Sequence, residues 1–286
     1  MEILETALIS LGISATYILV TFVTSFITQK KLELPDIVNW RIVISNGLVL
    51  AIPFFMVFWG LPKVINSVEL SEVVISGLIF MVISIVPTYE FLIAPLFIIR
   101  NEKLIQKRMT VIVENTPRPI QVSIVDKEFA NAYAIGVLSN TKAVLISRDL
   151  VSKMTPAEIN GLIAHEIGHL EKNHLFKLYL SSLLALLIGY LSTFYFYPII
   201  ENSGYNIHIL RGAHGALFYG FPTFLIPGLF QRKFEYQADV YASKLVGEEN
   251  YINSLIKLDD LTNGSVTRGG LTHPPLEKRK NKVLGG

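Results

Sequence analysis

The chain contains five long stretches of mostly apolar residues, and these restrict the folds that are open to it. The stretches cover residues 6–29, 42–62, 73–99, 178–200 and 212–231. A helix that crosses a bilayer needs about 20 consecutive, mostly apolar residues. We therefore predict an integral membrane protein with about five transmembrane helices.

The composition agrees with this prediction, because 51% of the 286 residues are hydrophobic and only 17% are charged. A soluble domain usually carries about 25% charged residues. The first apolar stretch is too long, and lacks the basic leader, to be a cleaved signal peptide. The last contains Pro222 and Pro227, so it could cross the membrane or form a re-entrant hairpin.

Basic residues between the apolar stretches predict the orientation in a cell membrane, since cytoplasmic loops are enriched in Lys and Arg. Such residues are Lys30, Lys31 and Arg41 after the first stretch, Arg100, Lys103, Lys107 and Arg108 after the third, Lys172 and Lys177 before the fourth, and Arg232 and Lys233 after the fifth. The other loops carry few. We therefore expect an outside N-terminus, with residues 100–177 and 231–286 in the cytoplasm.

Glu90 is the one charged residue inside the third apolar stretch. A charge in the bilayer costs at least about 2.5–3.5 kcal/mol, so this carboxyl group should be neutral, paired or facing a cavity. It could take part in substrate access from the membrane, or make a polar contact near the cytoplasmic end of its helix. We favour the polar contact.

These observations predict an α+β membrane protein in four segments. Residues 1–99 hold three transmembrane helices, residues 100–177 a catalytic domain, residues 178–231 two further transmembrane or re-entrant helices, and residues 232–286 the completion of the catalytic domain. In the polar segments, short β-branched runs predict strands at residues 110–113, 121–125 and 143–147. Residues 231–260 have a helical pattern, and the Gly- and Thr-rich residues 262–270 predict a loop.

A helix is predicted directly after these strands. Thr155 suits its N-cap, Pro156 its first position, and Glu158 the reciprocal place of a capping box. Apolar residues then recur at helical spacing. His165 and His169 therefore lie one turn apart on the same face of a helix.

The string His165–Glu166–x–x–His169 has the HEXXH spacing of zinc peptidases. Two imidazoles one turn apart can reach one ion at about 2.0–2.1 Å. Glu166 beside them can take a proton from the attacking water and pass it to the leaving amine. The string could also occur by chance on a surface helix, but the capped helix start and the flanking strands favour the metal site.

A catalytic zinc ion needs a third protein ligand, and the chain has no cysteine to supply it. The metzincin pattern requires a His ten residues after His165 and a Gly after seven, where this chain has Leu175 and Lys172. His174 is one residue early, so we reject that pattern. We expect His174 to be solvated or interfacial at the end of the helix.

A carboxylate from a later helix is the remaining source, and Glu235 is our choice. Asp239 lies four residues further on, on the same helical face, and could orient a ligand imidazole through its other nitrogen. These two residues could equally belong to an ordinary charged helix face.

Four strings in the same order resemble the HtpX-type membrane zinc peptidases, relatives of the CAAX prenyl endopeptidases. The strings are NAYAIG, HEIGH, EYQAD and HPPLEKR, and the resemblance covers roughly residues 100–280. It implies a gluzincin-like domain with one zinc ion per chain, bound by His165, His169 and Glu235. It further implies that Glu166 is the catalytic base and that Asp239 supports the ligands.

The resemblance also implies roles around the metal. Asn131 and Ala134 would lie on an edge strand that binds the substrate backbone, and Arg279 would also bind substrate. His273 would stand near the scissile carbonyl as a catalytic oxyanion stabiliser. Members of this family usually have two transmembrane helices before the catalytic domain, whereas three are predicted here.

The expected function is zinc-dependent hydrolysis of peptide bonds in membrane or unfolded proteins at the cytoplasmic face, as in membrane protein quality control. One alternative is CAAX-type processing of C-terminal peptides. Another is a catalytically silent receptor or scaffold, which the intact Glu166 disfavours. The expected partners are peptide or membrane-protein substrates and the lipid bilayer. The net charge of +2 gives no reason to expect nucleic acid, and the sequence indicates no oligomeric state.

Overall fold

The fold is known from a computed structural model, which describes residues 77, 80–81, 84–100, 105–111, 120–125, 131–205, 210, 213–214, 216–270 and 272–285. The first two predicted transmembrane helices and the predicted outside N-terminus lie beyond these residues. The chain divides into two compact units. One comprises Met1–Pro87 and Leu183–Thr223, and the other comprises Thr88–Ser182 and Phe224–Gly286. We call the second the catalytic unit, because it contains most of both segments predicted to form the catalytic domain.

A four-stranded mixed sheet forms part of the catalytic unit, with the strands in the order β1-β2-β4-β3. The strands are β1 (Ile105–Val111), β2 (Ile120–Val125), β3 (Ala132–Ile135) and β4 (Ala143–Ser147). Only the β2–β4 pair is parallel. The strands predicted at residues 121–125 and 143–147 are confirmed as β2 and β4. The strand predicted at residues 110–113 overlaps only the end of β1, which begins at Ile105, and residues 112–113 lie outside the described part of the chain. β3 shows no such pattern, and it lies at the sheet edge, as the resemblance implies.

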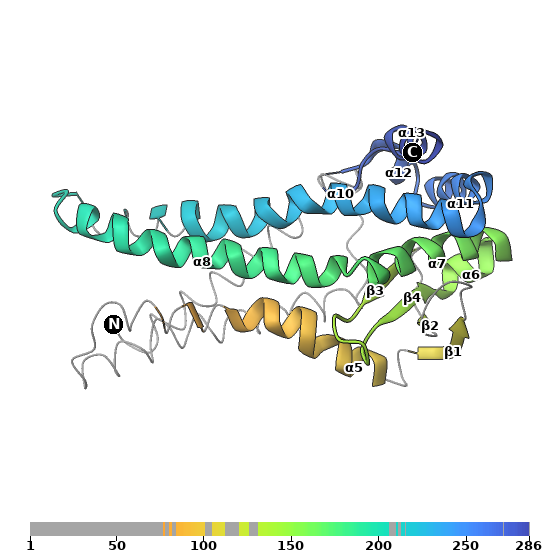
Figure 1. The fold of residues 1–286 in the computed structure, drawn as a ribbon, viewed down its shortest axis with the longest axis horizontal. Coiled ribbons are helices and arrows are strands. Elements are labelled where there is room, and N and C mark those ends of the chain that lie inside the picture. The colour runs from red at the N-terminus through yellow and green to blue at the C-terminus, as the bar shows by residue number, and fades with distance from the viewer. Residues whose placement is uncertain are drawn as a thin grey trace. The chain divides into compact units, whose positions relative to one another are not determined.

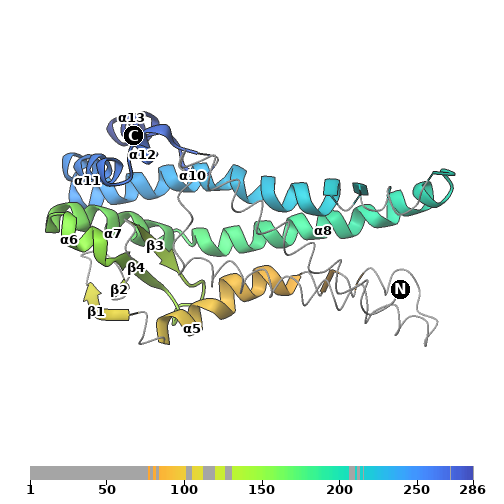
Figure 2. The same ribbon diagram turned by 180° about the vertical axis from the view of Figure 1, so that it is seen from behind.

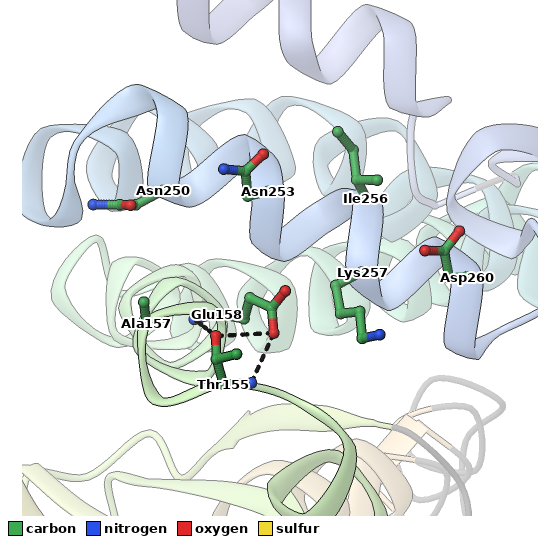
Figure 3. Close-up of a pocket in the computed structure, with 8 residues that line it drawn as sticks. All are labelled: Thr155, Ala157, Glu158, Asn250, Asn253, Ile256, Lys257 and Asp260. Atoms are coloured by element: carbon green, nitrogen blue, oxygen red, sulfur yellow. Dashed lines mark hydrogen bonds between the residues drawn. The ribbon is translucent and has the colours of Figure 1, made fainter.

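The HEXXH helix is α7 (Pro156–Glu171), which follows the short helix α6 (Arg148–Lys153). The predicted capping box is present. The Thr155 N–H donates to Glu158 Oε2 over 2.7 Å, and the Glu158 N–H donates to Thr155 Oγ1 over 3.4 Å (Figure 3). A cap of this kind stabilises a helix by about 1 kcal/mol, and here it fixes where α7 begins.

The apolar face of α7 packs on β3 and β4 (Figure 1). The buried residues of this core are Ile120, Val122, Ile124, Val144, Ile146, Leu150, Met154, Leu162, Ile163, Ile167 and Leu170. Full burial of each large aliphatic side chain contributes about 1.5–3 kcal/mol. The core therefore holds α7 in a fixed rotation about its axis, and the polar face of α7 with His165 and His169 turns away from it.

A second set of contacts holds α7 from the side of α11 (Glu248–Leu261), with α12 (Ser265–Arg268) and α13 (Leu276–Leu284) beside α11 (Figure 2). Gly161 makes this packing possible, because a Cβ there would lie 2.0 Å from Ser254 Oγ. Tyr251 and Leu255 of α11 are buried with residues of α13 in the second core cluster.

Two predictions for the C-terminal region need correction. The predicted helical segment 231–260 is two helices, α10 (Phe221–Val246) and α11, because Gly247 adopts a φ of 89° between them. Residues 262–270 are not wholly a loop, since α12 forms one helical turn there. Gly264 and Gly269, both with positive φ, flank that turn.

The helix α8 (His174–Glu201) is 28 residues long, and it confirms a helix over the fourth apolar stretch. In the part of the chain that the structure describes, it is the one helix that is long and apolar enough to cross a membrane. Leu184, Leu191 and Ile199 expose half or more of their surface. A helix that is apolar all round suits lipid better than water.

The third and fifth apolar stretches are helical where they are described. The third ends in the π-helix η2 (Tyr89–Ile93) and α5 (Ala94–Arg100), and the Glu90 side chain in η2 is exposed. The fifth contains the π-helix η3 (Ala216–Gly220) and the start of α10. Whether either stretch crosses a membrane stays a prediction.

Candidate metal centre

Three predicted ligands converge in the catalytic unit. His165 and His169 come from α7 and Glu235 from α10, and one donor atom of each lies within 4.8 Å of the others. The two imidazole Nε2 atoms are 3.1 Å apart. Glu235 Oε2 is 3.4 Å from His165 Nε2, and Glu235 Oε1 is 3.3 Å from His169 Nε2. We call these three side chains the metal cluster.

The cluster forms because α7 and α10 approach closely. Gly168 lies at their contact, where a Cβ would be 3.1 Å from Ala238 Cα. At this separation, a glutamate of α10 reaches both imidazoles of α7. Glu235 is 5% exposed and Asp239 is fully buried, so the interpretation of these two residues as an ordinary charged helix face is wrong.

The Nδ1 side of the His165 ring, away from the metal cluster, contacts a buried polar network. The Nδ1 atom lies 3.1 Å from Asp239 Oδ1 and 3.0 Å from the Tyr251 hydroxyl. That hydroxyl donates to Asp239 Oδ1 over 2.5 Å. Arg279 completes the network, because its Nη2 donates to Asp239 Oδ1 over 2.6 Å and its Nε to Oδ2 over 3.0 Å. We call these three supporting residues the ionic support.

The electrostatics of this region favour positive charge at His165. Burial alone would lower the pKa of His165, but hydrogen bonds with Asp239 and Glu235 more than offset this and raise it to about 10. Burial would raise the pKa of Asp239, but the Arg279 charge and the bonds with His165 and Arg279 lower it to about 2. The pKa of Glu235 is held well below its usual value, against burial, by hydrogen bonds with the two histidines. The same field attracts a metal cation.

His169 is held from behind by neutral groups. Its Nδ1 atom is 3.1 Å from His174 Nδ1, and His174 Nε2 is 2.9 Å from Gln237 Oε1. His174 is completely buried, so the prediction that it is solvated or interfacial is wrong. The cause is Asn173, whose φ of 53° turns the chain between α7 and α8 and directs His174 back towards His169.

Glu166 contacts the sheet edge. The Ala134 N–H of β3 donates to Glu166 Oε2 over 2.7 Å. Asn131 directly precedes β3, where its N–H and carbonyl bond to Ser147 and its side chain is exposed. Of these two predicted substrate-binding residues, Ala134 lies on the edge strand in contact with the predicted base, and Asn131 lies just before that strand. Their contact with substrate stays a prediction.

His273 and Arg279 both lie near Glu235 but differ in exposure. His273 Nε2 is 3.5 Å from Glu235 Oε1, and its side chain is 61% exposed. Arg279 is 5% exposed and bonds to Asp239 and Tyr251. The place of His273 suits contact with substrate, whereas that of Arg279 suits support of Asp239. Their predicted roles at the oxyanion and in substrate binding stay predictions.

The donor set suits a metal ion. Glu235 Oε2 is buried and makes no well-formed hydrogen bond among the described groups, since His165 Nε2 is 3.4 Å away and Arg279 Nη2 is 3.7 Å away. A buried carboxylate oxygen without a close partner is costly. A cation between the two Nε2 atoms and this oxygen would satisfy it. Two imidazoles and one carboxylate also leave a fourth coordination position open, as in catalytic zinc sites.

Comparison with known proteins decides the family. A family model described as peptidase family M48 matches residues 100–285. The chain belongs to peptidase family M48. A metal in the cluster therefore agrees with both the geometry and the family, and the resemblance to HtpX-type peptidases is confirmed.

Several M48 relatives are named Protease HtpX. That of Pasteurella multocida (strain Pm70) is 30% identical over 195 residues, which are 58% of this chain and 65% of the relative. That of Pseudomonas syringae pv. tomato is 31% identical over 191 residues, or 56% and 63% of the two chains. The match thus spans slightly less than two thirds of these relatives.

A crystal structure of S. mikatae Ste24p has a similar fold. The TM-score is 0.57 and the identity 22%, and the likeness covers 87% of this chain and 66% of that one. At this identity the comparison shows the M48 fold, with its small mixed sheet and mostly helical remainder.

A pocket of about 300 Å³ lies between the start of α7 and α11 (Figure 3). Its lining residues are Thr155, Ala157, Glu158, Asn250, Asn253, Ile256, Lys257 and Asp260. None belongs to the metal cluster or its supports. The pocket lies at the start of α7, whereas His165 and His169 are in the second half of that helix. We therefore do not assign the pocket to the reaction.

Sequence reasoning missed Tyr251 and Gln237 and misjudged His174. Tyr251 occurs among the apolar residues of an amphipathic helix, so its pattern matches any core tyrosine. Gln237 stands inside the string EYQAD that carries the resemblance. Its position two residues after Glu235 was the one available signal.

Proposed function

We propose that this chain is a zinc-dependent endopeptidase of the cell membrane with a gluzincin-like catalytic domain. The observation that carries the proposal is the convergence of His165, His169 and Glu235, with Glu166 adjacent on the same helix. Zinc suits a site of two imidazoles and one carboxylate better than the hard cations, which prefer oxygen ligands. We expect one zinc ion per chain.

The chain's own groups would perform the proton transfers of hydrolysis. Bound zinc supplies Lewis acidity, which polarises the peptide carbonyl and lowers the pKa of water. Glu166 accepts a proton from the attacking water and donates it to the leaving amine. His273 is close enough to the cluster to donate a hydrogen bond to the carbonyl oxygen as that oxygen gains negative charge.

Substrate would bind along β3. An edge strand offers unpaired N–H and C=O groups to an extended peptide, which can add to the sheet as a further strand. The Ala134 N–H at this edge is bonded to Glu166, so a peptide added here would have to replace that bond and would lie with its carbonyl groups near the base. This geometry favours unfolded or extended segments over folded proteins.

Membrane location completes the proposal. The apolar α8 supports it, as do the five apolar stretches and the basic loops between them. With an outside N-terminus, the catalytic unit would lie on the cytoplasmic face of a multi-pass protein. The substrates would then be membrane proteins or unfolded segments at that face, as in quality control. The relatives are named as proteases, which supports peptide-bond hydrolysis.

The test compares variants of the full chain, purified in detergent and loaded with zinc, on a fluorescently labelled unfolded protein. Glu166→Gln should bind one zinc ion per chain but lose about 10²–10⁴-fold in activity, because general acid–base catalysis contributes that much. Glu235→Ala should lose both zinc and activity. Glu171→Gln changes another glutamate of α7 outside the cluster and is the matched control. Equal cleavage by wild type and Glu166→Gln would leave the scaffold alternative standing.

A further inference from the structure

The two imidazoles of His169 and His174 face each other through the same kind of nitrogen. Their Nδ1 atoms are 3.1 Å apart, and a hydrogen bond at this distance needs one protonated and one unprotonated nitrogen. The position of one proton therefore decides the tautomers of both rings. Since His169 Nε2 belongs to the metal cluster, this proton bears on metal binding.

The fold holds the His174 ring firmly. The ring stacks on Phe234, with centroids 4.4 Å apart and planes at 9°, and it meets the His169 ring edge-on at 5.0 Å. Phe234 immediately precedes the ligand Glu235 on α10, and Gln237 follows two residues later. The same helix therefore supplies the third ligand, the stacking partner of His174 and the acceptor for its second nitrogen.

One arrangement of protons satisfies all these contacts. A neutral imidazole that binds metal through the Nε2 lone pair must carry its hydrogen on Nδ1. His169 then donates this hydrogen to His174 Nδ1. His174 in turn carries its own hydrogen on Nε2 and donates it to Gln237 Oε1, 2.9 Å away. The amide oxygen is an acceptor, so the series ends without an unpaired group.

We propose that His174 is a positioning residue for the metal centre: it accepts the Nδ1 hydrogen of His169 and so keeps the Nε2 lone pair of His169 directed at the ion, while Gln237 fixes the His174 tautomer. This inference rests on the proposed zinc site. Groups that orient ligand histidines in this way typically contribute 10–100-fold to metal affinity or activity.

The experiment uses two variants of the full-length protein in detergent that separate hydrogen bonding from packing. His174→Phe keeps a ring to stack on Phe234 but removes the acceptor. His174→Asn removes the ring but can place its Oδ1 near the position of Nδ1. The zinc dissociation constant is measured by competition with a chelating dye, and the thermal unfolding midpoint is measured for the metal-free protein.

If His174 positions His169, the two variants should rank in opposite orders in zinc affinity and in unfolding midpoint. His174→Phe should bind zinc 10–100-fold more weakly with an unfolding midpoint near that of wild type. His174→Asn should bind zinc more tightly than His174→Phe despite a lower midpoint. If affinity instead followed the midpoint, with His174→Asn the weaker binder, His174 would be a packing residue and the inference would fail. Wild-type protein that bound no zinc would overturn the proposed function along with it.

Discussion

The two histidines of α7 are one helical turn apart, yet the structure supports them in different ways. Behind His165 stands the ionic support, in which a buried aspartate and a buried arginine bond to each other and to Tyr251. Behind His169 stand a second histidine and a glutamine. The first support is charged and the second is neutral, although both hold the same type of ligand.

This difference predicts how substitutions in the supports of His165 and of His169 should act. A buried ion pair is costly to break, because removal of one partner leaves the other charge buried and unpaired. A neutral hydrogen-bond series carries less energy, since hydrogen bonds to ionised groups are roughly twice as strong. Damage to the ionic support should therefore mainly lower the free energy of unfolding, whereas damage to the neutral support should mainly alter metal binding.

Replacement of Arg279, the cationic member of the ionic support, should have the largest effect on stability. We expect Arg279→Ala to lower the free energy of unfolding by about 3–5 kcal/mol, because Asp239 would remain buried without its partner. Denaturant unfolding in detergent would measure this. Lys280→Ala changes the neighbouring basic residue, whose ion pair with Glu277 is partly exposed, and should cost less than about 1 kcal/mol. Similar losses in the two variants would contradict the comparison.

The pH dependence of the metal-free protein should come next. Because hydrogen bonds with Asp239 and Glu235 raise the pKa of His165 to about 10, the folded protein keeps a proton that the unfolded chain releases near pH 6.5. The stabilisation that this proton gives the folded protein is fully present below that pH. As the pH rises towards 10, the free energy of unfolding falls by about 1.4 kcal/mol per pH unit.

Metal loading supplies the control for this measurement. A zinc ion replaces the proton at His165, so the zinc-loaded protein should lose this part of its pH dependence. His165→Gln in the metal-free state should also flatten the curve between pH 7 and 10. If the slope persisted in that variant, the proton uptake would belong to another group.

Removal of the Tyr251 hydroxyl tests what the uncharged member of the ionic support contributes. We expect Tyr251→Phe to cost about 1–3 kcal/mol, because Asp239 Oδ1 and Arg279 Nη2 each lose a buried partner. The loss should be smaller than that of Arg279→Ala, since no charge is left unpaired. Tyr205→Phe, at a tyrosine that is 79% exposed, controls for the general effect of removing a hydroxyl.

The smallest effect is expected on the neutral side. Gln237→Leu removes the acceptor for His174 Nε2 and should cost about 1 kcal/mol, the lower end of the range for a buried group left without its partner, because a single neutral N–H is affected. Denaturant unfolding would again measure it. A loss as large as that of Arg279→Ala would erase the distinction between the two supports.

How far the sequence predicts this site depends on how local each contact is. His165, Glu166 and His169 share one helix, so spacing and a capping box sufficed to place them together. β4 was predicted with its observed bounds because a β-branched run has a local pattern. Glu235 lies 66 residues after His169, and spacing left it as one of two possibilities until its string matched a family.

The supports were beyond sequence reasoning because they depend on how the helices fold back. Tyr251 reaches His165 only because Gly247 turns α11 against α7. His174 looked like a residue at a solvated helix end, and one left-handed residue, Asn173, buries it instead. A single backbone angle thus reverses the environment of a side chain, and composition gives no sign of it.

The glycine at the crossing of α7 and α10 has a consequence for engineering. An alanine at position 168 would put its methyl carbon 3.1 Å from Ala238 Cα and from Tyr241 Cδ1, so the helices would have to separate by a few tenths of an ångström. Metal–ligand bonds tolerate only about ±0.2 Å. A designed pair of helices that carries this centre therefore needs its crossing residue and the length of its carboxylate ligand to be chosen together. The helix shift caused by one added methyl group is as large as the change that a metal–ligand distance tolerates.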